Sequence, residues 1–285
     1  MNEQTHIDIG SSQLGYRKLG DGPDIVFIHG WPLHRETWRH VAAALPNYTC
    51  HLIDLPGSGA SITPAATKVS LRGHVDAVVE AIEVLDLDEI VLVGQDSGGM
   101  VARFAMDRIG DSVSALILAG TEIPHHHPAV IDRLQMAAKL PGSASITARL
   151  MNTPRIVRSK QVLGGCFFDR DLIEGDFRTE VLDQTFRDKS VVKRQLEVLA
   201  SYTSDVVDEL AEVHPKIMCP TLLVWGKGDP FFPVGKARKM VEQFGGPTRF
   251  EVFDDARLLA HEEHPKRFAA LCAEFLVDPK TRSSG

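Results

Sequence analysis

The sequence predicts an α/β fold built on a mostly parallel sheet, with a helical insertion in the middle of the chain. Short apolar runs alternate with amphipathic segments of helical length, and this alternation stops after Pro124 and resumes only near residue 216. Runs that are apolar on both faces are typical of the central strands of a parallel sheet that helices cover on both sides. We therefore expect a core domain of residues 1–124 and 216–285, and a helical cap of residues 125–215.

The individual elements follow from the same pattern. Residues 6–20 indicate an antiparallel hairpin at the sheet edge. Amphipathic segments at 71–85 and 99–110 supply the helices of a βαβ rhythm, whose crossovers are right-handed. Runs rich in Val, Ile and Leu predict the buried strands, at 24–30, 50–57, 89–96, 114–120 and 221–229.

Composition narrows the functional class. The 285 residues are 44% hydrophobic and 24% charged with a net charge of −7, an ordinary globular balance. The sequence has no basic stripe, so nucleic-acid binding is not expected. It has no apolar run long enough to span a membrane. The four cysteines are scattered, which favours neither a metal site nor a disulfide framework, and the N-terminus does not read as a secretory signal. We therefore expect a cytoplasmic protein without a metal; the oligomeric state is open, with a homodimer as one alternative.

Residues 93–100, VGQDSGGM, have the form of a sharp turn from a strand into a helix. The apex of such a turn is strained, which lifts its side chain above the sheet. The residues two before and two after the apex must be small, because the chain nearly folds onto itself. Asp96 as apex has glycine at both positions, whereas Ser97 as apex would place Gln95 where it clashes. The spacing therefore predicts that Asp96 is the residue presented for reaction.

This turn resembles the Gly-x-Asp-x-Gly-Gly elbow of the epoxide hydrolases and haloalkane dehalogenases in the α/β-hydrolase superfamily. HGWP at 29–32 resembles the oxyanion loop of that group, and DLPGSGAS at 54–61 resembles its turn after the following strand. The match covers roughly 20–124 and 216–275, whereas 125–215 matches only in character. The resemblance implies an eight-stranded α/β-hydrolase sheet with a cap between strands six and seven, no cofactor, and a small hydrophobic organic substrate.

An aspartate at the nucleophile position changes the chemistry. A serine must lose its proton as it attacks and needs an adjacent base, whereas a carboxylate is ordinarily ionised at neutral pH. A carboxylate attacks amides poorly but displaces at saturated carbon, and epoxides and carbon–halogen bonds offer such carbons. The expected product of attack by Asp96 is an aspartyl ester, which disfavours ordinary ester or peptide hydrolysis.

Two backbone N–H groups should polarise the carbonyl of that ester when water attacks it. By position they belong to Ser97 and to Trp31 in HGWP, although a core position is the alternative for the Trp31 ring. Haloalkane dehalogenases usually have tryptophan directly after the nucleophile, and many have Asn at the second position, so both residues argue against a typical dehalogenase. His29 and Gln95 lie beside these donors and complete the candidate oxyanion and substrate-binding set.

Two further residues resemble catalytic positions of the superfamily. Tyr202, the one tyrosine of the cap, resembles a family tyrosine that donates to the leaving oxygen of an epoxide; a packed cap tyrosine is the equal alternative. Asp229 ends the 221–229 run and resembles the acid that orients the catalytic histidine; a turn-forming Asp before Pro230 is the alternative.

The catalytic histidine itself is missing. Glu263 and Pro265 fit the family's closing pattern, and counting back puts Leu258 where the base should stand. Three explanations remain: His261 or His264 swings in, one of the adjacent histidines at 125–127 supplies the base, or hydrolysis is not completed.

The leading hypothesis is a cofactor-free, epoxide-hydrolase-like enzyme with Asp96 as nucleophile. The rival is a non-hydrolytic catalyst of rearrangement, cyclisation or lyase chemistry, or a ligand-binding pseudoenzyme, in the same capped pocket. An esterase that uses Ser97 is a minor alternative.

Overall fold

The computed structural model describes residues 5–277. Its centre is one eight-stranded sheet with the order β1-β2-β4-β3-β5-β6-β7-β8. β2 pairs antiparallel with both β1 and β4, and every other pair is parallel. The sheet is therefore the mostly parallel, eight-stranded one that the sequence predicts. The strands are β1 (Thr5–Asp8), β2 (Gln13–Leu19), β3 (Asp24–Ile28), β4 (Thr49–Ile53), β5 (Ile90–Gln95), β6 (Val113–Ala119), β7 (Thr221–Gly226) and β8 (Thr248–Phe253).

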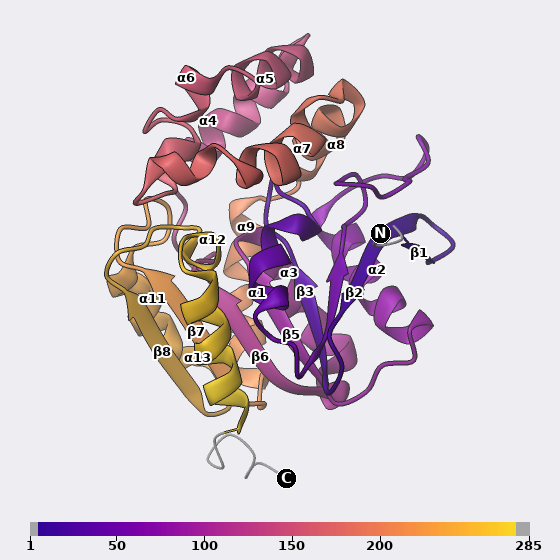
Figure 1. The fold of residues 1–285 in the computed structure, drawn as a ribbon, viewed down its shortest axis with the longest axis vertical. Coiled ribbons are helices and arrows are strands. Elements are labelled where there is room, and N and C mark those ends of the chain that lie inside the picture. The colour runs from indigo at the N-terminus through magenta and orange to yellow at the C-terminus, as the bar shows by residue number, and fades with distance from the viewer. Residues whose placement is uncertain (1–4, 278–285) are drawn as a thin grey trace.

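Helices cover both faces of the sheet, which explains why the central strands are apolar throughout. In β3, Val26 and Ile28 belong to one buried cluster with residues of α2 and α3, whereas Ile25 and Phe27 belong to a second cluster with residues of α1 and α13. Figure 1 shows α13 lying across one face of the sheet. The core helices are α1 (Arg39–Ala43), α2 (Leu71–Val84), α3 (Ser97–Ile109), α11 (Val234–Met240), α12 (Ala260–Glu263) and α13 (Pro265–Val277).

Between β6 and β7 the described chain is helical and contains no strand. In Figure 1 helices α4 to α8 of this helical insertion form a layer above the end of the sheet. The division into a core at 1–124 and 216–285 and a cap at 125–215 stays a prediction, and the change from strands to helices falls close to those limits. The helices are α4 (Ala129–Ala138), α5 (Ser143–Met151), α6 (Pro154–Val157), α7 (Asp183–Phe186), α8 (Lys189–Leu199), α9 (Ser204–Asp208) and α10 (Leu210–Val213).

Short 3₁₀-helical turns and a π-helical segment are the remaining helical elements of the described chain. One π-helical segment lies in the insertion, at Phe177–Leu182. The 3₁₀ turns are Arg35–Trp38, Gly110–Ser112, Leu163–Gly165, Arg170–Ile173, His214–Lys216 and Val241–Gln243.

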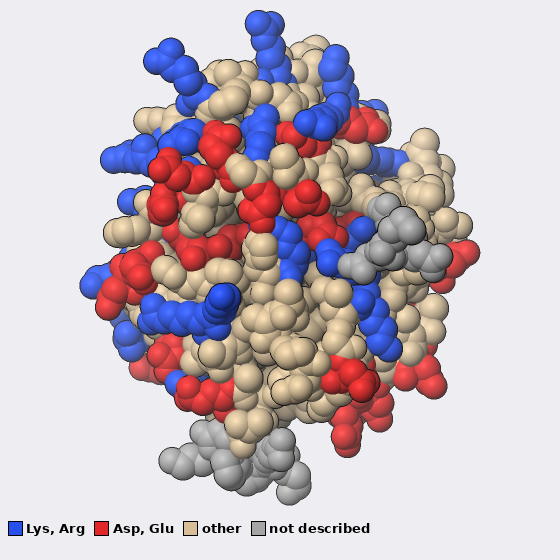
Figure 2. Space-filling model, viewed as in Figure 1, with Lys and Arg blue, Asp and Glu red and all other residues tan. Residues whose placement is uncertain are grey.

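On the face drawn in Figure 2, basic side chains stand out over the helical insertion at the top of the view, with acidic side chains below and among them.

Within residues 5–277, every helix is too short or too polar to cross a lipid bilayer.

Candidate active site

The turn after β5 is the strained bend that its glycines predict. Asp96 has φ 51° and ψ −134°, and α3 begins at the next residue. A Cβ on Gly94 would lie 2.5 Å from the Gly98 carbonyl oxygen, and one on Gly98 would lie 2.4 Å from the His29 carbonyl oxygen. Both positions therefore exclude any larger residue. The bend raises Asp96, and not Ser97, above the carboxyl end of the sheet.

Backbone hydrogen bonds hold this bend in place. The Asp96 N–H donates to the Gly120 carbonyl at 2.9 Å, and the Asp96 carbonyl accepts from the Gly99 N–H at 2.8 Å. The Ser97 N–H donates to Oδ1 of Asp96. One of the two expected oxyanion donors thus reaches the carboxylate directly.

The second expected donor is directed elsewhere. The Trp31 N–H donates to Oγ of Ser97 at 2.9 Å, and its expected role toward the ester carbonyl stays a prediction. The Trp31 ring is not in the core: its Nε1–H donates to the Gln195 carbonyl of α8, so the ring connects the loop after β3 to the helical insertion.

The Ser97 hydroxyl links three groups of the site. It forms hydrogen bonds with the Asp96 carboxyl and with the Tyr202 hydroxyl, in addition to the Trp31 N–H. Because a hydroxyl has one hydrogen and two lone pairs, Ser97 donates to the anionic carboxylate and accepts from the other two. Burial, the largest cause, raises the pKa of Tyr202 far above its usual value, so its hydroxyl keeps its proton.

A cavity of about 440 Å³ lies over the bend, between the strand ends and the helical insertion. Asp96, Gln95, Trp31 and Tyr202 line it. Most of the other lining side chains are apolar, among them Leu134, Leu150, Met151, Phe186, Leu196 and Val207 of the insertion. Its volume and apolar character suit a small organic ligand.

Gln95 is the least satisfied polar side chain at this cavity. It is fully buried, and neither its Oε1 nor its Nε2 has a hydrogen-bond partner within residues 5–277. A buried amide without partners costs free energy, so a ligand that bonds to it would recover that cost. A Cβ on Gly30 would lie 2.6 Å from Gln95 Oε1, so the glycine of HGWP leaves room for this side chain.

Glu122, three residues after the end of β6, is a cavity residue that the sequence reasoning missed. The signal was present: an acid follows a buried strand at the sheet edge where ligands bind in open α/β sheets. Burial raises the pKa of Asp96 well above its usual value; the charges of Glu122 and Asp229 raise it further, and the Ser97 hydrogen bonds oppose them. Burial also raises the pKa of Glu122, against the nearby Arg103 charge.

Only one of the two carboxyl oxygens of Asp229 has hydrogen-bond partners in the described chain. Its Oδ1 accepts from the backbone N–H groups of Phe231 and Phe232, each at 2.9 Å, while its buried Oδ2 has no partner in the described chain. A Cβ on Gly120 would lie 3.2 Å from this Oδ2 and 3.3 Å from Cδ1 of Leu258. The free oxygen and the leucine that stands where a histidine was expected thus both face Gly120. Burial raises the pKa of Asp229 to about 7.

His261 does not reach the cavity, which corrects its expected role as substitute base. It is fully buried on the other face of the sheet, where its ring lies 4.3 Å from that of Trp38, and its Nε2 bonds to the Thr37 hydroxyl at 2.8 Å. Burial lowers the pKa of His261 to about 3, so it stays neutral. His264 is also directed away, with Nε2 at 3.1 Å from the Asp255 carbonyl oxygen.

The histidines at 125–127 have other partners as well. His125 and His127 both pair with the Asp208 carboxylate, at 3.3 Å and 3.1 Å. His126 contacts the Phe231 carbonyl oxygen through Nε2 at 2.7 Å and Lys236 through Nδ1 at 2.9 Å. These partners orient the three rings at the entrance to the helical insertion, where His126 and His127 also line the cavity.

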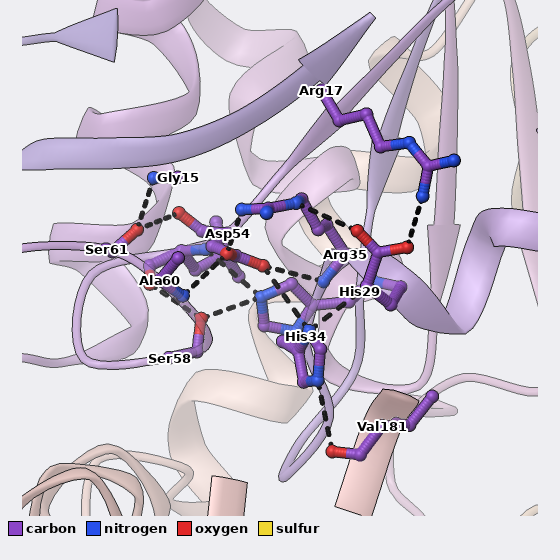
Figure 3. Close-up of polar contacts among 12 residues, drawn as sticks. Gly15, Arg17, His29, His34, Arg35, Asp54, Ser58, Ala60, Ser61 and Val181 are labelled. Atoms are coloured by element: carbon purple, nitrogen blue, oxygen red, sulfur yellow. Dashed lines mark hydrogen bonds and ion pairs between the residues drawn. The ribbon is translucent and has the colours of Figure 1, made fainter. Parts of the chain in front are cut away.

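His29 contributes to the site by fixing loops. Its Nε2 accepts from the Leu55 N–H at 3.1 Å and lies 2.9 Å from the Ser58 hydroxyl, and burial lowers its pKa to about 4. Figure 3 shows His29 beside the Asp54 carboxylate, which accepts from the Arg35 N–H at 2.8 Å. This cluster joins the loop after β3 to the loop after β4, and so fixes the segment that carries Trp31.

Comparisons with known proteins agree with this architecture. Residues 23–265 match the sequence family described as alpha/beta hydrolase fold. Pimeloyl-[acyl-carrier protein] methyl ester esterase of Chromobacterium violaceum is 27% identical, over 90% of this chain and 96% of the esterase. The solved epoxide hydrolase CorEH superposes with a TM-score of 0.80 at 19% identity, over 97% of this chain and 99% of its own. A mutant haloalkane dehalogenase DatA of Agrobacterium tumefaciens superposes with a TM-score of 0.81 at 18% identity, over 97% of each chain. The predicted fold class is confirmed, and the reaction has to be argued from the site.

Proposed function

We propose that this chain, which belongs to the alpha/beta hydrolase fold family, opens an epoxide by attack of Asp96 and forms an aspartyl ester. The observation that carries the proposal is the position of the Asp96 carboxyl: it stands at the strained bend, lines an apolar cavity and accepts the Ser97 N–H on one oxygen. A carboxylate held in this way has lost most of its hydration and keeps one oxygen for attack. Displacement of halide at a saturated carbon would begin with the same step.

The polar groups around Asp96 favour an oxygen leaving group over a halide. Opening an epoxide creates negative charge on oxygen, which an O–H or N–H donor stabilises. Tyr202 supplies a hydroxyl that stays protonated, and Gln95 supplies an amide without a partner in the described chain. The position after the nucleophile holds serine, where a tryptophan N–H would be expected to cradle halide.

The expected substrate is a small, hydrophobic epoxide. The apolar side chains of the helical insertion, which we propose acts as a cap, would enclose its hydrocarbon part. Tyr202, Gln95 and Asp96 are the polar groups at which the epoxide ring would be held. Among the lining residues of the described chain the acids Asp96, Glu122 and Asp132 outnumber the lone lysine, Lys160, which disfavours an anionic substrate.

A second function has one specific observation in its favour. Leu258 lines the cavity where a histidine base would stand, so the ester formed on Asp96 lacks the usual group that activates water. In that case the chain is a non-hydrolytic catalyst of rearrangement, cyclisation or lyase chemistry, or a protein that binds its ligand without turnover.

Intact-mass measurement after incubation with a panel of small epoxides tests the proposal. We expect the wild type to gain the mass of one epoxide during turnover or to release diol, and Asp96→Asn to do neither. The matched control is Asp88→Asn, an exposed aspartate that should react like the wild type. Ser97→Ala should still be alkylated, because the attacking atom is an Asp96 oxygen. Product formation that survives Asp96→Asn but not Ser97→Ala would instead indicate a serine esterase, and neither adduct nor diol across the panel would favour the second function.

A further inference from the structure

The contacts of the Thr121 hydroxyl indicate which neighbouring group carries a proton beside Asp96, the proposed nucleophile. Its Oγ1 lies 2.7 Å from Nη2 of Arg103, 2.8 Å from the carbonyl oxygen of Asp96 and 2.8 Å from Oε2 of Glu122. Arg103 has only donors, and the Asp96 carbonyl only accepts. Thr121 has a single hydrogen to give, so it cannot donate to both the Asp96 carbonyl and an ionised Glu122.

One assignment makes all three contacts hydrogen bonds. Thr121 donates to the Asp96 carbonyl, accepts from Arg103, and accepts a second bond from a protonated Glu122. An ionised Glu122 would leave two oxygens facing each other at 2.8 Å without a hydrogen between them, whichever way the hydroxyl turned. The contacts of Thr121 therefore indicate a neutral carboxylic acid at Glu122.

We propose that Glu122 stores the proton of the reaction as a neutral acid and, after releasing it, becomes the base that activates water against the Asp96 ester. This inference rests on the proposed function and supplies the base that Leu258 cannot. Glu122 lines the same cavity as Asp96 and follows the strand next to the bend.

The surroundings of Glu122 suit both states. Burial and the neighbouring carboxylates favour one shared proton among Asp96 and Glu122, because two close anions in an apolar cavity repel each other. The Ser97 N–H donates to Oδ1 of Asp96 and so favours the anion there, while the contacts of Thr121 place the shared proton on Glu122. The buried Arg103 guanidinium, 3.9 Å from Oε2 of Glu122, stabilises the carboxylate that remains once the proton has gone.

The proton balance closes over the cycle. An Asp96 oxygen bonds to an epoxide carbon, the carbon–oxygen bond of the ring breaks, and the leaving oxygen takes the proton of Glu122 while Tyr202 polarises it. The Glu122 carboxylate then removes a proton from water, whose oxygen bonds to Cγ of Asp96. The ester carbon–oxygen bond breaks, the departing diol oxygen takes a proton from Glu122, and the proton of the newly added hydroxyl returns to the pair. The sum is epoxide plus water giving diol.

The resting proton is tested without substrate by infrared spectroscopy near pH 7. We expect the wild type to show a carbonyl band of a protonated carboxyl that is absent from Glu122→Gln. The matched control, Glu83→Gln, changes an exposed glutamate of α2 and should keep the band. Because the difference spectrum isolates one residue, protonated Asp229 or Glu262 would not obscure it. A spectrum in which Glu122→Gln retains the whole band overturns the inference.

The base is tested by following adduct and diol together. Glu122→Gln should be alkylated on Asp96 more slowly, because the leaving oxygen loses its proton donor and keeps only the Tyr202 hydroxyl. Release of diol from the adduct should fall by about 10²–10⁴, the usual contribution of a general base, so the adduct accumulates. Glu122→Asp keeps the carboxyl and should recover part of the release, which a merely structural role would not predict. Alkylation and thermal unfolding of each variant confirm that it is folded.

The possible failures are distinct. Diol release by Glu122→Gln within about tenfold of the wild type contradicts the inference and leaves the proposed attack by Asp96 standing, since a lost general base costs roughly 10²–10⁴. A wild type that forms the adduct but releases no diol also contradicts the inference and leaves the proposed attack by Asp96 standing. A wild type that forms neither overturns the inference together with the proposed function.

Discussion

Replacing Asp229 by Asn should stabilise the protein, and more so as the pH rises. The buried carboxyl has two backbone N–H donors on Oδ1 and none on Oδ2 in the described chain, and its pKa is raised from 3.8 to about 7. One pKa unit corresponds to about 1.4 kcal/mol, so full ionisation in the folded state costs about 4 kcal/mol. In the Asp229→Asn variant the amide oxygen would keep both N–H bonds, and the NH₂ group would replace the unpaired oxygen beside Leu258.

The direction with pH follows from proton binding in the two states. Below pH 3.8 Asp229 is protonated in both the folded and the unfolded chain. Between about pH 4 and pH 7 the unfolded chain has lost the proton while the folded chain still holds it, so the free energy of unfolding falls as the pH rises. Above pH 7 both states are ionised and the loss is complete.

Thermal unfolding of the wild type and Asp229→Asn between about pH 5 and pH 8.5 measures this effect. We expect a gain of about 2–4 kcal/mol at the upper pH, or roughly 5–10 °C in Tm for a chain of this size, and a gain smaller by about 2 kcal/mol at the lower pH. Asp88→Asn, on the surface, is the control and should change little. A gain that does not grow with pH, or a lower Tm at the upper pH, would refute the reasoning.

Two further changes separate catalytic from structural residues. In a Glu122→Gln background, Leu258→His should speed diol release by about tenfold or more, because a general base contributes roughly 10²–10⁴ and residue 258 lies, like the free Oδ2 of Asp229, beside Gly120; an unchanged release rate in a steady-state diol assay would argue against this position for the base. His261→Ala should lower the free energy of unfolding by about 2–4 kcal/mol in denaturant titrations, because it removes the ring packed on Trp38 and its bond to Thr37. The folded fraction of His261→Ala should still be alkylated at the wild-type rate, and a slower reaction would mean that His261 acts in the chemistry after all.

The sequence by itself determined most of the fold, because the signals are local. Strands apolar on both faces and helices with apolar stripes can be read within a few residues, and every predicted strand run overlaps an observed strand. β8 was not among the predicted runs, because it is an edge strand whose residues are mostly half-exposed and therefore mix polar with apolar. The bend at Asp96 was also local: its glycines at fixed spacing admit one apex.

Only the tertiary structure decided which groups meet at that bend. The sequence predicts that the Trp31 N–H serves the Asp96 ester, and only the structure shows that this N–H bonds to the Ser97 hydroxyl. It allowed His261 to replace the missing base, but α12 directs that ring to Trp38 on the far face of the sheet. It overlooked Glu122, whose importance comes from neighbours that are distant along the chain. Residue order fixes which side chains a strand end presents, whereas the partner of each depends on how separate strand ends and the helical insertion pack together around one cavity.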